Sequence, residues 1–353
     1  MKIETITDQN AWQNFVYKLN LNTFLHSLQW IEFNKLQEHP FWQLGLYNDS
    51  NELISVALIL KITARRGTFL FCPHGPQSQN NENLKECEKE LAEWKKYLSK
   101  LAKHENCSFF RIQPIAQKNT ENQLVFKNAG FRPAPIHMHT ELSTVLDITC
   151  PLEEVLMKMR KTTRQMIRRS ELLVQEKKVE LEFFDKITPE LFEVYKSTGS
   201  RGKFVGYSDK YLEDEYESFA GLNSKLGGSK VKLFAVRYRG QILSWAMVLF
   251  TEKRAFYHQG ANILNKEIPA SYLCQWTGIK LAKELGCISY DFWGVSPLDN
   301  PAHPWAKISV FKRGFAGKDV ELLHAQDYVL NWKYWLNWVV ESYRARKRGF
   351  VGS

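Results

Sequence analysis

The sequence of 353 residues lacks the signals of several protein classes. No apolar run reaches the roughly 20 residues of a membrane-spanning helix, and residues 1–5 do not lead into the apolar core of a signal peptide. The six cysteines form no C-x-x-C pair. We therefore expect reduced thiols, a cytoplasmic location and no metal site. No P-loop, dinucleotide-binding fingerprint, H-E-x-x-H or G-x-S-x-G motif occurs, which argues against the enzymes that those motifs define.

The composition is that of a globular protein with an excess of positive charge. The hydrophobic share of 44% and the charged share of 24% are ordinary, and the length allows two domains with cores of their own. The formal net charge is +10. This charge fits either a solvated basic surface or a polyanionic partner such as RNA, nucleotide phosphates or an acidic membrane face. The aromatic share of 13% favours the second interpretation, because bases and lipid headgroups bind to aromatic rings beside cations.

The second half of the sequence repeats landmarks of the first half in the same order. Each copy has two strands joined by a polar turn, then a strand after a helical run, and then a Phe-Lys element that ends in Gly-Phe. These landmarks fall at residues 44–58, 107–111 and 126–131, and again at residues 233–247, 287–291 and 311–315. The repeat predicts a duplicated α/β domain. We expect the functional site in or beside the cleft between the two copies.

The repeat divides the chain into two predicted domains. Residues 1–148 with residues 323–353 make the first domain, and residues 149–322 make the second. Residues 324–348 are predicted to form a final helix with an aromatic and apolar stripe and a basic end. We favour docking of this stripe on the first domain. Contact with an anionic membrane surface is the alternative.

A long basic helix is predicted to begin at Pro151, which suits a first helical turn. Apolar residues from Leu152 to Ile167 give this helix one apolar face, and Lys161, Arg164 and Arg168 lie on another at three- and four-residue spacing. The cations fit a solvated helix face and an RNA-backbone stripe equally well.

Residues 291–317 are the densest concentration of residue types that could carry chemistry. A strand ends in Trp293-Gly294, a proline-rich loop follows, and Phe311-Lys312 lies in what we interpret as a strand-to-turn element. Strand ends followed by loops often carry functional sites. A lysine beside a phenylalanine suggests a ring that stacks and a cation that holds negative charge.

At this stretch the chain resembles the FemABX peptidyltransferases, and the resemblance extends over most of its length. The family builds the interpeptide bridges of peptidoglycan with amino acids taken from aminoacyl-tRNA. The resemblance implies an α/β fold of two tandem GNAT-like (acyl-CoA N-acyltransferase-like) domains. It implies an aminoacyltransferase whose partners are aminoacyl-tRNA and a UDP-linked or lipid-linked peptidoglycan precursor. No segment is long enough for the family's coiled-coil arm, so this chain resembles a short member.

The resemblance also implies roles for individual residues. Phe311 and Lys312 match the pair that meets the aminoacyl-tRNA acceptor end and supports transfer. Lys35 and Arg201 match the cations that grip the phosphates of the precursor. Three aromatic residues are expected to contact substrate, and four cations are expected to contact RNA. These are Trp30, Tyr257 and Trp293, and then Lys161, Arg164, Arg168 and Arg313.

The sequence leaves two other functions open. A GNAT enzyme that uses acyl-CoA needs a glycine-rich turn at the start of a helix, and residues 262–271 contain no glycine. We expect no cofactor and a monomer, with Lys312 acting as a cation and His258, His303 and His324 acting outside any metal site. The alternatives are another acyltransferase, which uses acyl-CoA or a different amine acceptor, and a non-catalytic protein that binds RNA or a membrane surface. The amino acid transferred and the form of the precursor stay open.

Overall fold

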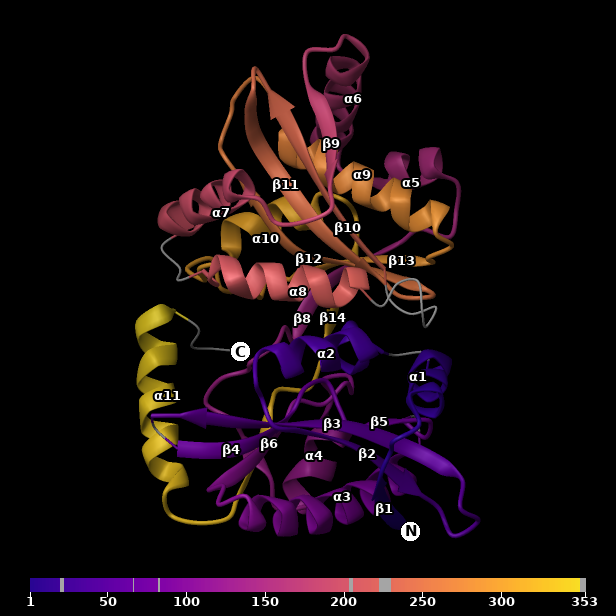
Figure 1. Ribbon diagram of the computed structural model, residues 1–353, viewed down its shortest axis with the longest axis vertical. Helices are drawn as coiled ribbons and strands as arrows, with labels where there is room; N and C mark the ends of the chain where they lie inside the picture. Colours follow the sequence, from indigo (N-terminus) through magenta and orange to yellow (C-terminus); the bar gives the residue numbers. More distant parts are fainter. Residues whose placement is uncertain (20–21, 66, 82, 203–205, 222–229, 350–353) are drawn as a thin grey trace. The chain divides into compact units, whose positions relative to one another are not determined.

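The computed structural model describes residues 1–19, 22–65, 67–81, 83–202, 206–221 and 230–349, and it divides the chain into two compact units (Figure 1). Unit 1 comprises Met1–Glu141, Asp299–His303 and Val320–Ser353, and unit 2 comprises Leu142–Leu298 and Pro304–Asp319. Each unit holds one mixed sheet with helices on it, which confirms the predicted α/β class. Among the described helices, none combines the length and the apolar composition needed to cross a bilayer.

Unit 1 is built on a sheet with the strand order β1-β2-β3-β4-β6-β15-β7, in which β5 pairs with β3. Only β4 and β6 pair in parallel among its recorded ladders, and a long helix connects them. The elements are β1 (Lys2–Thr5), α1 (Gln9–Lys18), η1 (Phe24–His26), α2 (Leu28–Leu36), β2 (Phe41–Tyr47), β3 (Leu53–Ala64), β4 (Gly67–Cys72), β5 (Gln77–Ser78), α3 (Leu84–His104), β6 (Phe109–Ile112), α4 (Thr120–Asn128), β7 (Arg132–Pro133), β15 (Gln326–Val329) and α11 (Tyr334–Arg348).

Helix α3 illustrates how the sequence forms this unit. Its buried residues Leu91, Trp94 and Leu98 recur at helical spacing and pack on the sheet, and the indole of Trp94 donates to Ser55 Oγ at 3.1 Å. The side chain of Asn83 accepts a hydrogen bond from the amide of Glu86, which caps the start of the helix. This amphipathic pattern is why residues 82–104 are recognisable as a helix from sequence.

Unit 2 is built on a sheet with the strand order β14-β8-β13-β12-β11-β10-β9. Here β12 and β13 are the parallel pair, and α9 connects them. The elements are β8 (Leu142–Asp147), α5 (Leu152–Lys158), α6 (Lys161–Gln175), β9 (Glu180–Phe184), α7 (Pro189–Gly202), α8 (Asp209–Gly221), β10 (Lys230–Tyr238), β11 (Gln241–Phe250), β12 (Arg254–Asn262), α9 (Ala270–Glu284), β13 (Ser289–Gly294), α10 (Ala306–Arg313) and β14 (Lys318–Glu321).

The two faces of the second sheet are covered by different helices. Trp245 and Ala246 are neighbours on β11, so their side chains point to opposite faces. The Trp245 indole donates to the backbone oxygen of Leu191 on α7 at 2.9 Å. Ala246 belongs to the core cluster formed with α9, to which Leu273 and Trp276 contribute.

Two strands pair outside the sequence repeat that they follow. Strand β8 comes after the landmarks of the first repeat but pairs with β13 of the second, and β15 comes after the landmarks of the second repeat but pairs with β6 of the first. The sequence-based division places residues 142–148 with the first domain, although β8 pairs in the sheet of unit 2. A buried network holds the C-terminal segment in unit 1. Arg111 on β6 donates to Asp327 on β15 at 2.7 and 2.9 Å and to Glu341 on α11 at 2.8 Å.

The structure corrects three predictions about single elements. The Phe-Lys element is helical in both copies, with Lys127 in α4 and Lys312 in α10, and it is not the strand-to-turn element that we expected. The predicted basic helix is two helices, because Met159 has an extended backbone and the amide of Arg160 donates to Gly314 O at 3.0 Å. The final helix begins at Tyr334, since Gln326–Val329 form β15. Residues 221–229, a glycine-rich stretch of the sequence before β10, lie outside the described residues from residue 222 on.

Candidate active site

The parallel strands β12 and β13 of unit 2 pair only at one end. Their register joins Arg254 to Ser289 and Phe256 to Asp291, and both strands continue beyond these rungs without pairing to each other. After Asp291 the edge of β13 that faces β12 therefore has backbone groups that do not pair with β12, while Gly294 still pairs with Ser143 of β8 on the other edge. The predicted residues Tyr257, Trp293 and Lys312 all lie at this divergence.

Lys312 is a buried lysine that hydrogen-bonds to the C-terminal end of β13. It extends from the last turn of α10, is 7% exposed, and donates from Nζ to the backbone oxygen of Gly294 at 2.8 Å. Nζ also lies 5.7 Å from the ring centroid of Tyr257. Burial lowers the pKa of Lys312 to about 8, and the charge of Asp291 opposes this shift. The amine is therefore easier to deprotonate than that of an exposed lysine, whereas the sequence analysis expected it to act only as a cation.

Asp291 and Trp293 form a constrained turn at the end of β13. The carboxylate of Asp291 accepts from the amide of Trp293 at 2.8 Å and pairs with Arg254 at 3.4 Å. Burial raises the pKa of Asp291, and the guanidinium of Arg254 opposes this shift. Trp293 has a φ of 59°, which is strained for a large side chain. Such strain is often found where a structure holds a residue for function.

A second polar group lies beside Trp293 and was missed by the sequence analysis. Glu215 on α8 is fully buried, and its carboxylate lies 2.7 Å from His258 Nε2 and accepts from Gln259 at 3.1 Å. The ring of His258 contacts the ring of Trp293 at a centroid distance of 6.2 Å. The sequence context of His258 suggested an isolated residue, but the structure gives it Glu215 and Trp293 as neighbours. No local signal links it to Glu215, which is 43 residues earlier in the chain.

The other aromatic residues predicted for the site differ in their surroundings. Tyr257 occupies space left by Gly260, where a Cβ atom would come within 2.2 Å of the tyrosine oxygen. Phe311 packs against the rings of Tyr272 and Phe315 with centroid distances of 5.0 and 5.3 Å. The described contacts of Phe311 are thus those of a packing residue that supports α10.

The residues expected to grip the precursor are divided between the units. Arg201 of unit 2 is exposed at the end of α7 and donates to the backbone oxygen and the side chain of Asn262 at 2.8 and 2.6 Å. Trp30 and Lys35 belong to α2 of unit 1. Trp30 is buried among aromatic rings. Lys35 is exposed and pairs with Glu32 at 2.9 Å.

Three of the four cations expected to bind RNA make contacts within unit 2. Arg164 donates to the backbone oxygens of Met157 and Met159, so it caps the end of α5. Arg168 pairs with Glu153 at 3.2 Å. Arg313 pairs with Asp319 and donates to a backbone oxygen. Lys161 is exposed in the first turn of α6. Arg164 and Arg168 of α6 thus already have partners within unit 2, and contact of these cations with RNA stays a prediction.

Each of the two mixed sheets contains a parallel pair of strands, and a helix connects the strands of that pair. This arrangement in both units defines a tandem GNAT-like fold. A tandem GNAT protein from the clavulanic acid biosynthesis pathway has this fold, with a TM-score of 0.55 and 9% identity over 93% of this chain and 98% of that one. The structure of L-PGS from Bacillus licheniformis matches with a TM-score of 0.51 and 12% identity, over 98% of each chain. The crystal structure of FemX matches with a TM-score of 0.76 and 17% identity, over 97% of this chain and all of that chain.

The FemAB family model matches residues 7–233, which is more than half of the chain. The chain therefore belongs to the FemAB family, a transferase family of peptidoglycan bridge synthesis, as the resemblance predicted. No curated protein has a significantly similar sequence. The family match ends before β11, so Lys312 and its surroundings lie outside it. The geometry around Lys312 is thus an observation independent of that match.

Proposed function

We propose that this protein transfers an amino acid from aminoacyl-tRNA to the amine of a peptidoglycan precursor stem peptide. Family membership supports the general reaction, and the buried lysine at the divergence of β12 and β13 is the observation that carries the proposal. In this proposal unit 2 binds the donor and unit 1 contributes to binding the acceptor.

The reaction needs little covalent chemistry from the protein, because an aminoacyl ester is already activated. The acceptor nitrogen attacks the ester carbonyl, a C–N bond forms, and the C–O bond to the ribose breaks. One proton leaves the attacking amine, and one proton is gained by the departing ribose oxygen. A protonated Lys312 stabilises negative charge on the oxygens and can give its proton to the ribose oxygen, because its pKa of about 8 suits transfer near neutral pH.

The residues around Lys312 have supporting roles in the proposal. Asp291 favours the charged form of the lysine electrostatically. The carbonyl of Gly294 fixes the position of Nζ, and the Tyr257 ring lies beside it. In the proposal, this ring and that of Trp293, which precedes Gly294 in the chain, stack on the acceptor end of the tRNA. The Glu215–His258 pair lies next to Trp293 and is the candidate group for taking the proton of the attacking amine.

We also propose that the protein works at an anionic membrane surface, where it meets the lipid-linked form of the precursor. Helix α11 turns Asn337 and the buried Glu341 toward unit 1. Its opposite face exposes apolar and aromatic side chains that are 45–65% accessible, namely Trp335, Leu336, Val339 and Tyr343. The exposed cations Arg346 and Lys347 flank this face. Aromatic rings beside basic residues suit the interface of an anionic bilayer.

The acyl-CoA alternative is less well supported. Residues 263–269 connect β12 to α9, which is where a GNAT enzyme would cradle a pyrophosphate, and the connection contains no glycine. A non-catalytic binding protein would have no need for a lysine buried beside the end of β13.

One assay distinguishes these functions. The purified protein is incubated with aminoacyl-tRNA, or with acetyl-CoA, and with either the UDP-linked or the lipid-linked precursor in anionic vesicles. The mass of the acceptor is then followed. We expect an increase by one aminoacyl residue with charged tRNA, and faster transfer to the lipid-linked acceptor. Transfer from acetyl-CoA alone, or no transfer from any donor, would refute the proposal.

A further inference from the structure

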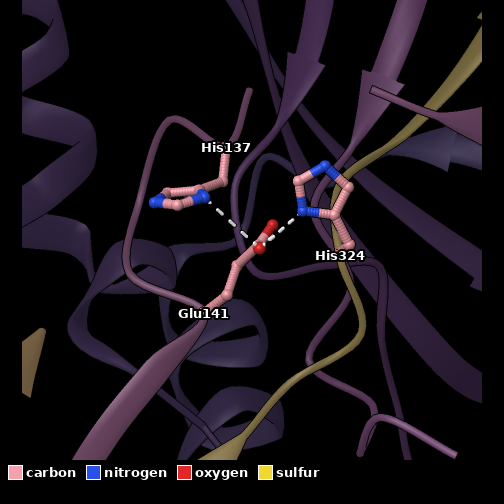
Figure 2. Close-up of side chains that lie close together, drawn as sticks. All are labelled: His137, Glu141 and His324. Carbon is pink, nitrogen blue, oxygen red and sulfur yellow. Dashed lines mark hydrogen bonds and ion pairs between the residues drawn. The ribbon is translucent and has the colours of Figure 1, made fainter. Parts of the chain in front are cut away.

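Two residues of unit 1 that are four positions apart, and a third that follows 183 residues later, bring their side chains to one point. Figure 2 shows His137, Glu141 and His324 with the glutamate between the two rings. Glu141 Oε2 lies 2.7 Å from His324 Nδ1 and 3.4 Å from His137 Nδ1. The three side chains are largely buried, with 7–18% exposure. Among the described residues, this is the His, Cys, Asp and Glu group whose ligand atoms all lie within 4.8 Å of one another.

The hydrogen bonds of His324 require a positive charge at this point. Its Nε2 lies 2.8 Å from the backbone oxygen of Ala134, which only accepts hydrogen bonds, so Nε2 carries a proton. Nδ1 faces the carboxylate of Glu141, which also accepts only. A lone pair on Nδ1 would be repelled there. At 2.7 Å a second proton lies between Nδ1 and the carboxylate, and a metal ion can take its place only if the two atoms separate.

Hydrogen bonds from the surroundings orient His324 and Glu141 as outer-shell contacts orient metal ligands. The Nε2–H of His324 is anchored by a backbone carbonyl, which is the usual second contact of a metal-bound imidazole. The other carboxylate oxygen of Glu141 accepts from the amide of Ala325 at 2.7 Å. The backbone oxygen of Glu141 accepts from the amide of Leu322 at 2.7 Å. Glu141 Oε2 is thus left to face the two imidazoles.

We propose that His137, Glu141 and His324 form a binding site for a divalent transition-metal ion, with Zn²⁺ as the expected occupant. Two imidazoles and one carboxylate are a zinc ligand set that keeps a fourth position for water or another ligand. Tetrahedral bonds of about 2.1 Å place ligand atoms about 3.4 Å apart, and the separation of His137 from Glu141 has this value. The 2.7 Å between His324 Nδ1 and Glu141 Oε2 has to lengthen by about 0.7 Å to reach this value, and the three ligand atoms already lie within 4.8 Å of one another. The metal joins the loop after β7 to the segment before β15, and this inference does not depend on the transferase activity.

Metal content and metal affinity test the site. The full-length protein is stripped with a chelator, dialysed against micromolar Zn²⁺, and measured for bound zinc and for thermal unfolding. We expect one zinc per chain and a rise in Tm with added zinc, because an ion that binds the folded state stabilises it. Co²⁺ should give the visible absorption of a tetrahedral site with nitrogen and oxygen ligands.

Variants identify the ligands. His137→Ala, Glu141→Gln and His324→Ala should each weaken zinc binding by more than the roughly 10–100-fold that loss of an outer-shell partner causes. His104→Ala is the matched control, since His104 makes a surface pair with Glu105 at 3.0 Å. His137→Ala keeps the test valid if the variant of the more buried Glu141 does not fold. The site is refuted if the folded protein binds no zinc, which leaves the proton as the bridging charge. It is equally refuted if all three variants retain zinc.

Discussion

Lys312→Met is the substitution that most directly tests how the candidate site works. Methionine keeps the length and the packing of the lysine stem but has no charge and no proton to give. The loss of one charge-stabilising group typically costs about 10²–10³ in kcat, and we expect kcat/KM for aminoacyl transfer to fall by this factor. Lys127→Met is the matched control, because Lys127 occupies the equivalent position in α4 but is exposed. It should leave transfer almost unchanged.

The same substitution is expected to lower activity without lowering the free energy of unfolding. The pKa of Lys312 falls from 10.5 to about 8 on folding. Each pKa unit corresponds to about 1.36 kcal/mol, so the buried charge costs on the order of 3 kcal/mol at neutral pH. Methionine removes this cost but also loses the hydrogen bond to the Gly294 carbonyl, and that loss offsets about 1–3 kcal/mol of the gain. We therefore expect Lys312→Met to unfold with an equal or slightly higher free energy at pH 7, measured by urea denaturation.

The same pKa shift also predicts how the free energy of unfolding depends on pH. Between pH 8 and pH 10.5 the unfolded lysine is protonated while the folded one is neutral, so the unfolded state binds more protons. Stability contributed by this group therefore rises with pH across that window and is lowest below pH 8. Relative to the wild type, the Lys312→Met protein should lack this rise. Activity that depends on protonated Lys312 should decline above about pH 8 in the wild type.

Several outcomes would refute this reasoning. Equal and small losses of activity in the Lys312→Met and Lys127→Met proteins would make both lysines structural. A Lys312→Met protein that is several kcal/mol less stable, with the wild-type pH dependence, would show that the lysine is not a destabilising buried charge. Lys312→Arg should rescue little, because a guanidinium is larger than an ammonium and does not give up its proton at these pH values.

Three further predictions concern the substrates and the membrane. Lys35→Ala and Arg201→Ala should each raise the KM for the precursor, since a charged hydrogen bond contributes about 1.5–3 kcal/mol, and an unchanged KM in both would remove them from the acceptor site. The affinity for aminoacyl-tRNA should fall with salt with a log–log slope of about 0.7–0.9 per phosphate contact, and salt-independent binding would contradict a tRNA donor. Sedimentation with vesicles that contain phosphatidylglycerol should fall at least about tenfold in a Trp335→Ala/Leu336→Ala protein, whereas equal binding by wild type and variant would exclude α11 as the membrane contact.

The sequence alone was sufficient to predict the fold class, because the elements of each half carry strong local patterns. The apolar spacing of residues 84–104 identifies α3, and the repeated order of strands, helical run and Phe-Lys element identifies the duplication. Family membership was also recognisable, since it depends on sequence motifs. The Phe-Lys element was misassigned as extended because α10 is short, and its apolar residues Ile308 and Val310 are exposed while Ser309 and Lys312 are buried.

The tertiary structure decided the properties that give these residues their chemistry. Burial of Lys312 against the Gly294 carbonyl lowers its pKa, and nothing in the local sequence distinguishes it from the exposed Lys127. The pairs Glu215 with His258 and Glu141 with His324 are separated by 43 and 183 residues. A pKa and a hydrogen-bond partner depend on distances through space, and only packing of the sheets and helices sets those distances. For the same reason, the polar face of α11 is the buried one, although its apolar stripe alone predicted the opposite.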